Sequence, residues 1–225
     1  MQQRFFPDPK TKGVFIDIGA ARPDYLSVSA YFRTLGWRVI GIEPNPKFYE
    51  QHKSRGYEVY QFACGDRDED NVNFNVVDSH GAQYENGEVS YESFSSLGLK
   101  ESYAKLSGKL DTQTIKVSLR RLSTLLQKDI PNVPRVDILS VDVEGWELEV
   151  LNGLDLTKHR PTIIIAENLF KEKKYEDHLK QMGYTLWRRI HPNDVYVDDA
   201  FIKTTGSPLR FTLERFGYKL GLLGK

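Results

Sequence analysis

Short apolar runs alternate with stretches of helical spacing along most of the chain. The apolar runs predict buried strands over residues 14–18, 38–42, 58–63, 136–141 and 161–166. Helical spacing lies between them, and helix starts are marked in places by a capping residue followed by proline, as at Asn45 and Pro46. Strands that alternate with helices are typical of parallel α/β sheets. The pattern therefore predicts an α/β fold with a doubly wound, mostly parallel sheet.

The remaining segments complete this prediction. Residues 184–190 and 194–197 predict an antiparallel pair at the edge of the sheet. Two further strands are expected over residues 72–77 and 114–119, and helices over residues 25–35, 46–55, 122–127, 145–151 and 173–182. Residues 78–99 are rich in Ser, Gly, Glu and Asn and show no period, so we expect a mobile flap there. Its aromatic residues, with Tyr103 just beyond, are candidates for stacking on a sugar ring: Tyr91, Phe94 and Tyr103.

The C-terminal segment is predicted to be a separate unit. We expect one domain over residues 1–200 and a basic amphipathic helix within residues 201–225. The apolar residues of this tail recur at helical spacing: Leu209, Leu213, Phe216 and Leu220. Two interpretations fit: the helix packs on the domain, or it makes a peripheral contact with an anionic membrane surface.

Composition narrows the class of partners and the compartment. The chain carries 31 basic and 31 acidic residues, so the positive charge typical of nucleic-acid-binding proteins is absent. Cys64 is the single cysteine, which excludes an internal disulfide and fits a reducing compartment. No signal-peptide pattern or apolar run long enough for a membrane span is evident. We expect a cytoplasmic protein with no nucleic-acid partner and no transmembrane segment.

Two strand ends predict a nucleoside site. Residues 14–21 run from a buried strand into a turn at Gly19 and then toward a helix, and ligands of open α/β sheets bind beyond such strand ends. Gly19 lets backbone approach a ligand closely, and Asp17 offers hydrogen-bond acceptors to the ligand or the turn. Glu43 ends the second strand, where one carboxylate can accept both ribose hydroxyl protons.

The turn after Gly19 distinguishes two nucleoside cofactors. A dinucleotide requires a glycine-rich loop so that its diphosphate can rest on a helix N-terminus. Here Gly19 is followed by Ala-Ala-Arg-Pro, and Asp24 would bring negative charge near the diphosphate. S-adenosylmethionine has no phosphate, and its sulfonium favours nearby carboxylates. The turn therefore favours S-adenosylmethionine over NAD.

With these motifs, the chain resembles the FkbM-type family of S-adenosylmethionine-dependent methyltransferases over residues 14–197. The resemblance rests on residues 15–20 (FIDIGA), 41–45 (GIEPN) and 137–147 (DILSVDVEGWE). It implies a class I methyltransferase sheet of the Rossmann-like kind and methyl transfer, usually to a hydroxyl oxygen of a sugar or secondary metabolite. Many members have a further glycine where this chain reads Gly-Ala-Ala-Arg-Pro from residue 19.

The third strand end completes the predicted cofactor site. The adenine ring is expected beside residues 62–66, with Cys64 as a polarizable wall rather than a nucleophile, because no histidine lies nearby in the sequence. The candidate cofactor-binding residues are Asp17, Gly19, Ala20, Ser27, Glu43, Pro44, Asn45, Cys64, Gly65, Asp66, Ser96 and Asp142.

Acids at two later strand ends are the candidates for chemistry. An alcohol is a poor nucleophile, so a base or a metal must assist loss of its proton. By analogy with catechol-type O-methyltransferases, Asp142, Glu167 and Asn168 form an oxygen-only set that suits Mg²⁺, Mn²⁺ or Ca²⁺. Metal-free general-base catalysis by Asp142, Glu144 or His191 is the alternative mechanism.

These observations predict an O-methyltransferase whose acceptor is a hydroxyl of a glycan, a glycolipid or a secondary metabolite. Two alternatives remain open. One is a carboxylate methyltransferase that forms a methyl ester, and the other is a nucleoside-binding module without catalysis.

Overall fold

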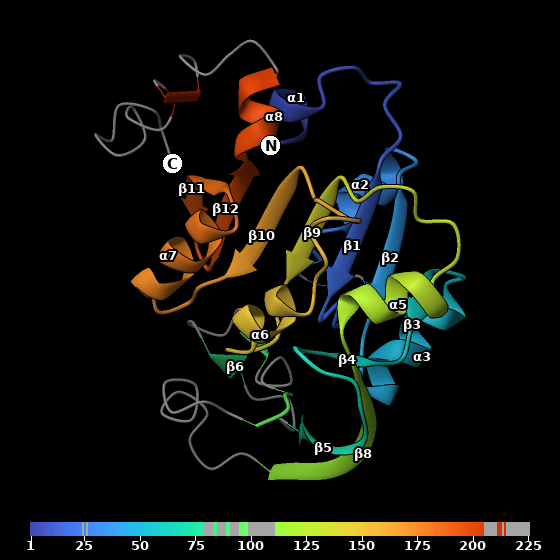
Figure 1. Cartoon of the computed structure of the whole chain (residues 1–225). Helices are drawn as coiled ribbons and strands as arrows, with labels where there is room; N and C mark the ends of the chain where they lie inside the picture. The colour runs from blue at the N-terminus through green and yellow to red at the C-terminus, as the bar shows by residue number, and fades with distance from the viewer. Residues whose placement is uncertain are drawn as a thin grey trace.

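The computed structural model describes residues 1–23, 25, 27–78, 83–84, 89–90, 95–98, 111–204, 211–212 and 214. Its centre is a seven-stranded sheet with the order β11-β12-β10-β9-β1-β2-β3 (Figure 1). These strands are β1 (Val14–Ile18), β2 (Arg38–Ile42), β3 (Glu58–Tyr60), β9 (Ile138–Val141), β10 (Ile163–Glu167), β11 (Tyr184–Ile190) and β12 (Asn193–Asp198). Neighbouring strands are parallel except around β12, which is antiparallel to both β10 and β11. The predicted doubly wound sheet with an antiparallel edge is confirmed.

Apolar side chains cover both faces of this sheet. Ile16 and Ile18 of β1 belong to a core shared with α5 (Leu122–Lys128), α6 (Glu147–Asn152) and α7 (Lys173–Gln181). Phe15 points to the opposite face, where it packs in a second core with residues of α1 (Gln2–Phe5) and α2 (Ala30–Thr34). Because successive strand residues alternate between faces, a strand buried on both sides reads as a continuous apolar run. This explains why the parallel strands could be located from the sequence.

The strand order reverses at β1, which lies between β2 and β9. Ile18 pairs with both Ile42 and Val141, so the carboxyl ends of these three strands are level. Such a switch point leaves a crevice beyond the strand ends. The residues that follow the three strands, including Gly19, Glu43 and Asp142, therefore lie around one crevice.

A second, smaller sheet differs from the prediction. The segment expected as one strand over residues 58–63 divides into β3 and β4 (Ala63–Cys64), and β4 pairs with β8 (Asp111–Arg120) instead of continuing in the large sheet. β8 also pairs with β5 (Glu69–Asp78). Both β5 and β8 extend beyond their predicted ranges. The polar residues at their ends pair by backbone hydrogen bonds, and a prediction from the spacing of apolar residues does not detect such pairing. β6 (Gln83–Tyr84) and β7 (Val89–Ser90) form a separate pair within the predicted flap.

Two helices also differ from the expected ranges. α2 is shorter than the predicted helix over residues 25–35, because residues 28–29 form a turn in which the buried Ser29 hydrogen-bonds Asp17. α3 (Pro46–Ser54) agrees closely, and Asn45 caps it by accepting a hydrogen bond from Lys47 N at 3.0 Å. Across the part of the chain that the structure describes, no helix combines the length and the apolar character needed to cross a membrane.

The tail is described only in part. α8 (Asp199–Thr204), which was not predicted, runs across the expected boundary at residue 200. Phe211 is buried in the same core as Trp187, and Glu214 forms an ion pair with Arg4 at 2.9 Å. The described residues of the tail therefore contact the domain. The apolar residues of the predicted tail helix and the candidate flap aromatics lie outside the described residues: Leu209, Leu213, Phe216, Leu220, Tyr91, Phe94 and Tyr103.

Candidate functional site

A cavity of about 660 Å³, part of it open to solvent, lies at the carboxyl ends of the central strands. It is mostly apolar with a few polar groups, which is typical of small-molecule sites. The described residues that line it are Ile18, Gly19, Ala21, Ile42, Glu43, Pro44, Phe48, Phe62, Ala63, Cys64, Phe74, Ser95, Ser96, Leu97, Asp142, Val143, Glu144 and Trp146. The cavity therefore forms at the switch point, where the sequence predicted a nucleoside site.

Gly19 brings two strand ends together. It has a φ of +76°, and a Cβ added there would lie 1.7 Å from the carbonyl oxygen of Asp142. A side chain is therefore excluded by the protein's own backbone as well as by the backbone conformation. Gly19 also lines the cavity, and the close approach of the strand end at Asp142 is by itself enough to require glycine there.

Glu43 is a buried acid in the cavity wall. Its Oε2 accepts a hydrogen bond from Ala21 N at 2.8 Å, and its Oε1 accepts one from Asn45 N at 2.7 Å. Burial raises the pKa of Glu43 to about 7, although both hydrogen bonds oppose the shift. Each carboxylate oxygen has a second lone pair. Glu43 can therefore accept two hydrogen bonds from a ligand while it holds the turn after β1.

Several of the predicted cofactor-binding residues lie near the cavity without lining it. Asp17 is buried and hydrogen-bonds Ser29 and Ser140, and burial raises its pKa. Ser27 Oγ lies 3.2 Å from Ser29 Oγ. Ala20 is buried next to Gly19, while Asn45 uses its side chain to cap α3. Asp17, Ala20, Ser27 and Asn45 are not among the lining residues, so the structure gives them a supporting position.

The wall next to the third strand end is apolar. Phe62, Cys64 and Phe74 line it, and burial raises the pKa of the Cys64 thiol, which makes the thiol unreactive. Pro44 lines the cavity beside Glu43. The predicted contacts Gly65 and Asp66 do not line it: Gly65 N donates to Arg120 O at 3.1 Å, and Asp66 forms an ion pair with Arg67 at 3.4 Å.

Residues 95–97 line one side of the cavity. Ser96 exchanges two backbone hydrogen bonds with Asn75 of β5, at 2.8 and 3.0 Å. The Ser96 side chain is 2% exposed, and its Oγ has no hydrogen-bond partner among the described residues. Buried hydroxyls are nearly always hydrogen-bonded. The Ser96 hydroxyl is therefore available to a ligand in the cavity.

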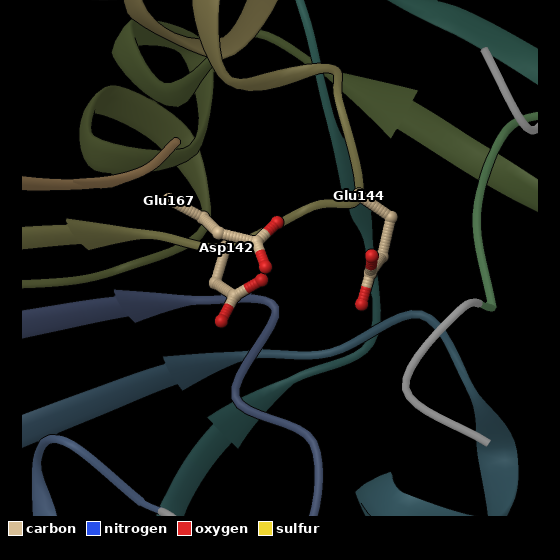
Figure 2. Close-up of side chains that lie close together, drawn as sticks. All are labelled: Asp142, Glu144 and Glu167. Atoms are coloured by element: carbon tan, nitrogen blue, oxygen red, sulfur yellow. The ribbon is translucent and has the colours of Figure 1, made fainter. Parts of the chain in front are cut away.

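Three carboxylates gather beside the cavity, of which Asp142 and Glu144 line it and Glu167 does not. One oxygen each from Asp142, Glu144 and Glu167 lies within 4.8 Å of the other two. Figure 2 shows the carboxylates of Asp142 and Glu167 pointing toward one another, with Glu144 facing them across a gap. Burial raises the pKa of Asp142 to about 7, and the charges of Glu147 and Asp17 add to the effect. Asp142 also hydrogen-bonds Glu167, which requires the pair to share a proton.

Two other predicted chemical residues lie elsewhere. Asn168 Oδ1 accepts from Glu172 N at 2.8 Å, and its Nδ2 donates to Asp194 at 2.8 Å, so its amide orients the loop that follows β10. Among the Asp, Glu, His and Cys side chains of the described residues, Glu144 is the one that joins Asp142 and Glu167 in a cluster. His191 is exposed in the turn between β11 and β12 and does not line the cavity.

A family model described as the methyltransferase FkbM domain matches residues 17–220. The chain belongs to this family. Membership confirms the resemblance and supports a methyltransferase activity, and the match extends beyond residue 197, where the resemblance was expected to end. The chain is also 30% identical over 124 residues to Methyltransferase 1 of Beauveria bassiana (strain ARSEF 2860). That alignment covers 52% of this chain and 49% of the relative, so the chain spans about half the length of this curated relative.

The cavity of this FkbM domain also has walls that were not predicted. Phe48, Phe74 and Leu97 line it, as does Trp146, whose Nε1 donates to Gly98 O at 2.8 Å. Trp146 stands within the motif at residues 137–147. Its place shortly after Asp142 and Glu144, which the sequence marked as site residues, could have identified it as a residue of the cavity wall. Phe74 was detectable as an apolar residue of an alternating strand, but its partner sheet was not predicted. Leu97 lies in a segment without period, where no sequence signal marks it.

Proposed function

We propose that this FkbM domain is an S-adenosylmethionine-dependent O-methyltransferase that acts on a hydroxyl of a glycan, a glycolipid or a secondary metabolite. The observation that supports it best is a cavity lined by Glu43, by the unsatisfied Ser96 hydroxyl and by two members, Asp142 and Glu144, of a cluster of three acids. The fold and the family support methyl transfer, while the cavity supports the cofactor and the acceptor chemistry.

The chemistry of the cavity wall fits a cationic nucleoside. The free lone pairs of Glu43 suit two ribose hydroxyls, and the wall of Phe62, Cys64 and Phe74 suits a flat aromatic ring. Among the described residues that line the cavity there are three acids and no lysine, arginine or histidine. This charge balance suits a sulfonium and opposes the diphosphate of a dinucleotide. It therefore supports S-adenosylmethionine.

The acid cluster is suited to removing a proton from an alcohol. S-adenosylmethionine, when bound, supplies an electrophilic methyl group. Asp142 has a pKa of about 7, which places it in the range where a general base works best at neutral pH. With the cofactor bound, Asp142 would accept the hydroxyl proton as the acceptor oxygen bonds to the methyl carbon and the carbon–sulfur bond breaks, which leaves S-adenosylhomocysteine. Glu167, which already shares a proton with Asp142, would hold the Asp142 carboxylate in place. Glu144 borders the same space and orients the hydroxyl.

A divalent cation is the second way in which the cluster can act. Oxygens that share Ca²⁺ at about 2.3–2.6 Å lie no more than about 5 Å apart, and the oxygens of Asp142, Glu144 and Glu167, all within 4.8 Å of one another, meet this limit. The smaller Mg²⁺, at about 2.0–2.1 Å, requires its oxygen ligands to come within about 4.2 Å of one another. A bound cation would lower the pKa of the acceptor hydroxyl. Turnover measured with and without EDTA separates the two mechanisms. Full activity in excess chelator excludes the cation, and loss that Mg²⁺ or Mn²⁺ restores excludes the metal-free base.

Transfer of a labelled methyl group tests the proposed function. The domain is incubated with methyl-labelled S-adenosylmethionine and a panel of glycosides, phenols and carboxylic acids, and the products are treated with mild alkali. We expect label that survives alkali, because an ether resists hydrolysis. Label released by alkali would identify a methyl ester and a carboxylate methyltransferase. No transfer despite cofactor binding would favour a nucleoside-binding module.

A further inference from the structure

Glu147 is a buried acid that the proposed chemistry does not use. It is the first residue of α6 and is 0% exposed. Its Oε1 accepts hydrogen bonds from Val143 N at 3.1 Å and Gly145 N at 2.9 Å, and its Oε2 accepts one from Tyr175 Oη of α7 at 2.6 Å. Hydrogen bonds to a carboxylate are stronger than those between neutral groups. Glu147 is therefore fixed between the turn after β9 and a helix on the face of the sheet.

The turn held by Glu147 has an unusual backbone. Glu144 has a φ of +58° and Gly145 a φ of +96°. A residue other than glycine rarely adopts this left-handed region and does so only where the surroundings hold it. Backbone N–H groups around left-handed residues can converge on one anion, and here the N–H groups on both sides of Glu144 converge on Glu147 Oε1. The carboxylate of Glu147 is the anion around which this turn closes.

The same turn sets the position of Glu144. Glu144 and Asp142 line the cavity, and Glu144 brings an oxygen within 4.8 Å of oxygens of Asp142 and Glu167. Glu147 does not line the cavity. It can therefore affect a reaction there only through the backbone that carries Glu144 and through its charge.

We propose that Glu147 and Tyr175 are positioning residues that hold the turn at residues 143–145, so that the Glu144 carboxylate joins Asp142 and Glu167 at the cavity. This inference rests on the proposed methyl transfer for its effect on catalysis. Its structural part, the position of the turn, does not require an acceptor.

Three variants test the inference by separating charge, shape and stability. In Glu147→Leu the two N–H groups of the turn lose their acceptor. In Glu147→Gln the amide oxygen still accepts both, and the amide NH₂ donates to Tyr175 Oη. Tyr175→Phe removes one hydrogen bond and leaves Glu147 in place, so it provides a milder change where Glu147→Leu folds poorly. Leu179→Ala is the matched control, because Leu179 lies buried on the same helix as Tyr175 but outside this network.

The measurements are kcat with the acceptor found in the labelling panel, KM for S-adenosylmethionine, and the melting temperature. We expect Glu147→Leu to lower kcat about 100-fold, the scale of a misplaced catalytic group, with little change in KM. Tyr175→Phe should lower kcat less, and Glu147→Gln should restore most of it. Leu179→Ala should lower the melting temperature and leave kcat unchanged. Wild-type kcat in Glu147→Leu, or an equal loss of kcat in Leu179→Ala, would overturn the inference.

The fluorescence of Trp146 reports the conformation of the turn at residues 143–145, and the measurement needs no methyl acceptor. In a Trp37→Phe, Trp187→Phe background, Trp146 is the remaining tryptophan and stands next to Glu147. We expect its emission to shift in Glu147→Leu and to stay unchanged in Glu147→Gln. An unchanged spectrum in Glu147→Leu would contradict the inference. If the spectrum shifts but the wild type methylates no acceptor, the turn-holding role stands and the proposed function is the part that fails.

Discussion

Two acid-rich regions of this molecule shift the pKa values of their carboxyl groups in opposite directions. At the cavity, Glu43 and Asp142 are held among apolar side chains and other acids, and burial raises the pKa of each to about 7. On the small sheet, Asp70 is exposed and pairs with Arg120, whose hydrogen bond lowers the pKa of Asp70. Asp68 and Arg121 form a similar pair at 3.0 Å.

The difference distinguishes acids placed to act on a ligand from acids that only face solvent. An exposed acid beside arginine is satisfied by water and its partner, and such pairs add little to stability. An acid buried without a cation is costly, so its presence calls for a reason. Perturbed pKa values of this kind cluster at functional sites. The cavity acids are therefore the ones expected to act on a ligand.

The largest effect is expected from removing an acid of the cluster. Asp142→Asn should lower the rate of methyl transfer about 10²- to 10⁴-fold, because a positioned general base contributes on that scale. Asp70→Asn on the small sheet should leave the rate unchanged. The rate is measured with labelled S-adenosylmethionine, and the affinity for S-adenosylhomocysteine is measured alongside. Equal rates for the two variants would remove the distinction between the regions.

A smaller effect is expected at Glu43, the acid that we propose binds the ribose. Glu43→Gln should weaken binding of S-adenosylhomocysteine about 10- to 100-fold, because hydrogen bonds to a buried charged group are worth about 1.5–3 kcal/mol. Glu69→Gln, at an exposed acid of β5 that pairs with Arg67 at 2.7 Å, is the control and should bind normally. Calorimetry gives both dissociation constants, and wild-type affinity in Glu43→Gln would contradict the assigned role.

The Ser96 hydroxyl should contribute less than the acids. Ser96→Ala is expected to weaken cofactor binding about 3- to 10-fold, the value of one neutral hydrogen bond of about 0.5–1.5 kcal/mol. It should not lower the melting temperature, since the hydroxyl has no hydrogen-bond partner among the described residues. Ser118→Ala, which removes a hydrogen bond to Asp70 on the small sheet, serves as the control for binding. A loss of stability without a loss of affinity in Ser96→Ala would assign the hydroxyl to the fold.

The two regions should also differ, by a smaller amount, in how stability depends on pH. The pKa of Glu43 is raised on folding, so the native state binds its proton more tightly than the unfolded state. Its contribution is fully present below pH 4.5 and is lost as the pH rises to about 7. The pKa of Asp70 is lowered on folding, so its contribution appears as the pH rises above the acid range. Urea unfolding at a series of pH values gives the slope of the free energy of unfolding against pH for each group. The Glu43 slope should vanish in Glu43→Gln and the Asp70 slope in Asp70→Asn. Slopes of the same sign for the two groups would refute the contrast.

The sequence predicted the central sheet and the place of the cavity because these follow from local signals. Strands buried on both faces read as apolar runs, and Glu43 and Asp142 stand directly after two of them. The same logic failed at the small sheet, since pairing of residues distant in the chain, such as Cys64 with Arg120, leaves no local pattern.

Details of the site depend on contacts of a related kind. Asn168 follows β10 as a metal ligand would, and its amide is hydrogen-bonded to Glu172 and Asp194, while Glu144 lies near Asp142 and Glu167. The left-handed backbone that directs Glu144 depends on Glu147, and a contact of this kind cannot be read from residue type alone. Strand ends are thus predictable from sequence, whereas the direction of each side chain after them depends on tertiary contacts.

Titration calorimetry with S-adenosylmethionine and with NAD tests the central claim most directly, because the claim is that the cavity binds an adenosine attached to a sulfonium cation rather than to a diphosphate. We predict saturable binding of S-adenosylmethionine at one site and no measurable heat from NAD. Binding of NAD without binding of S-adenosylmethionine would contradict the account.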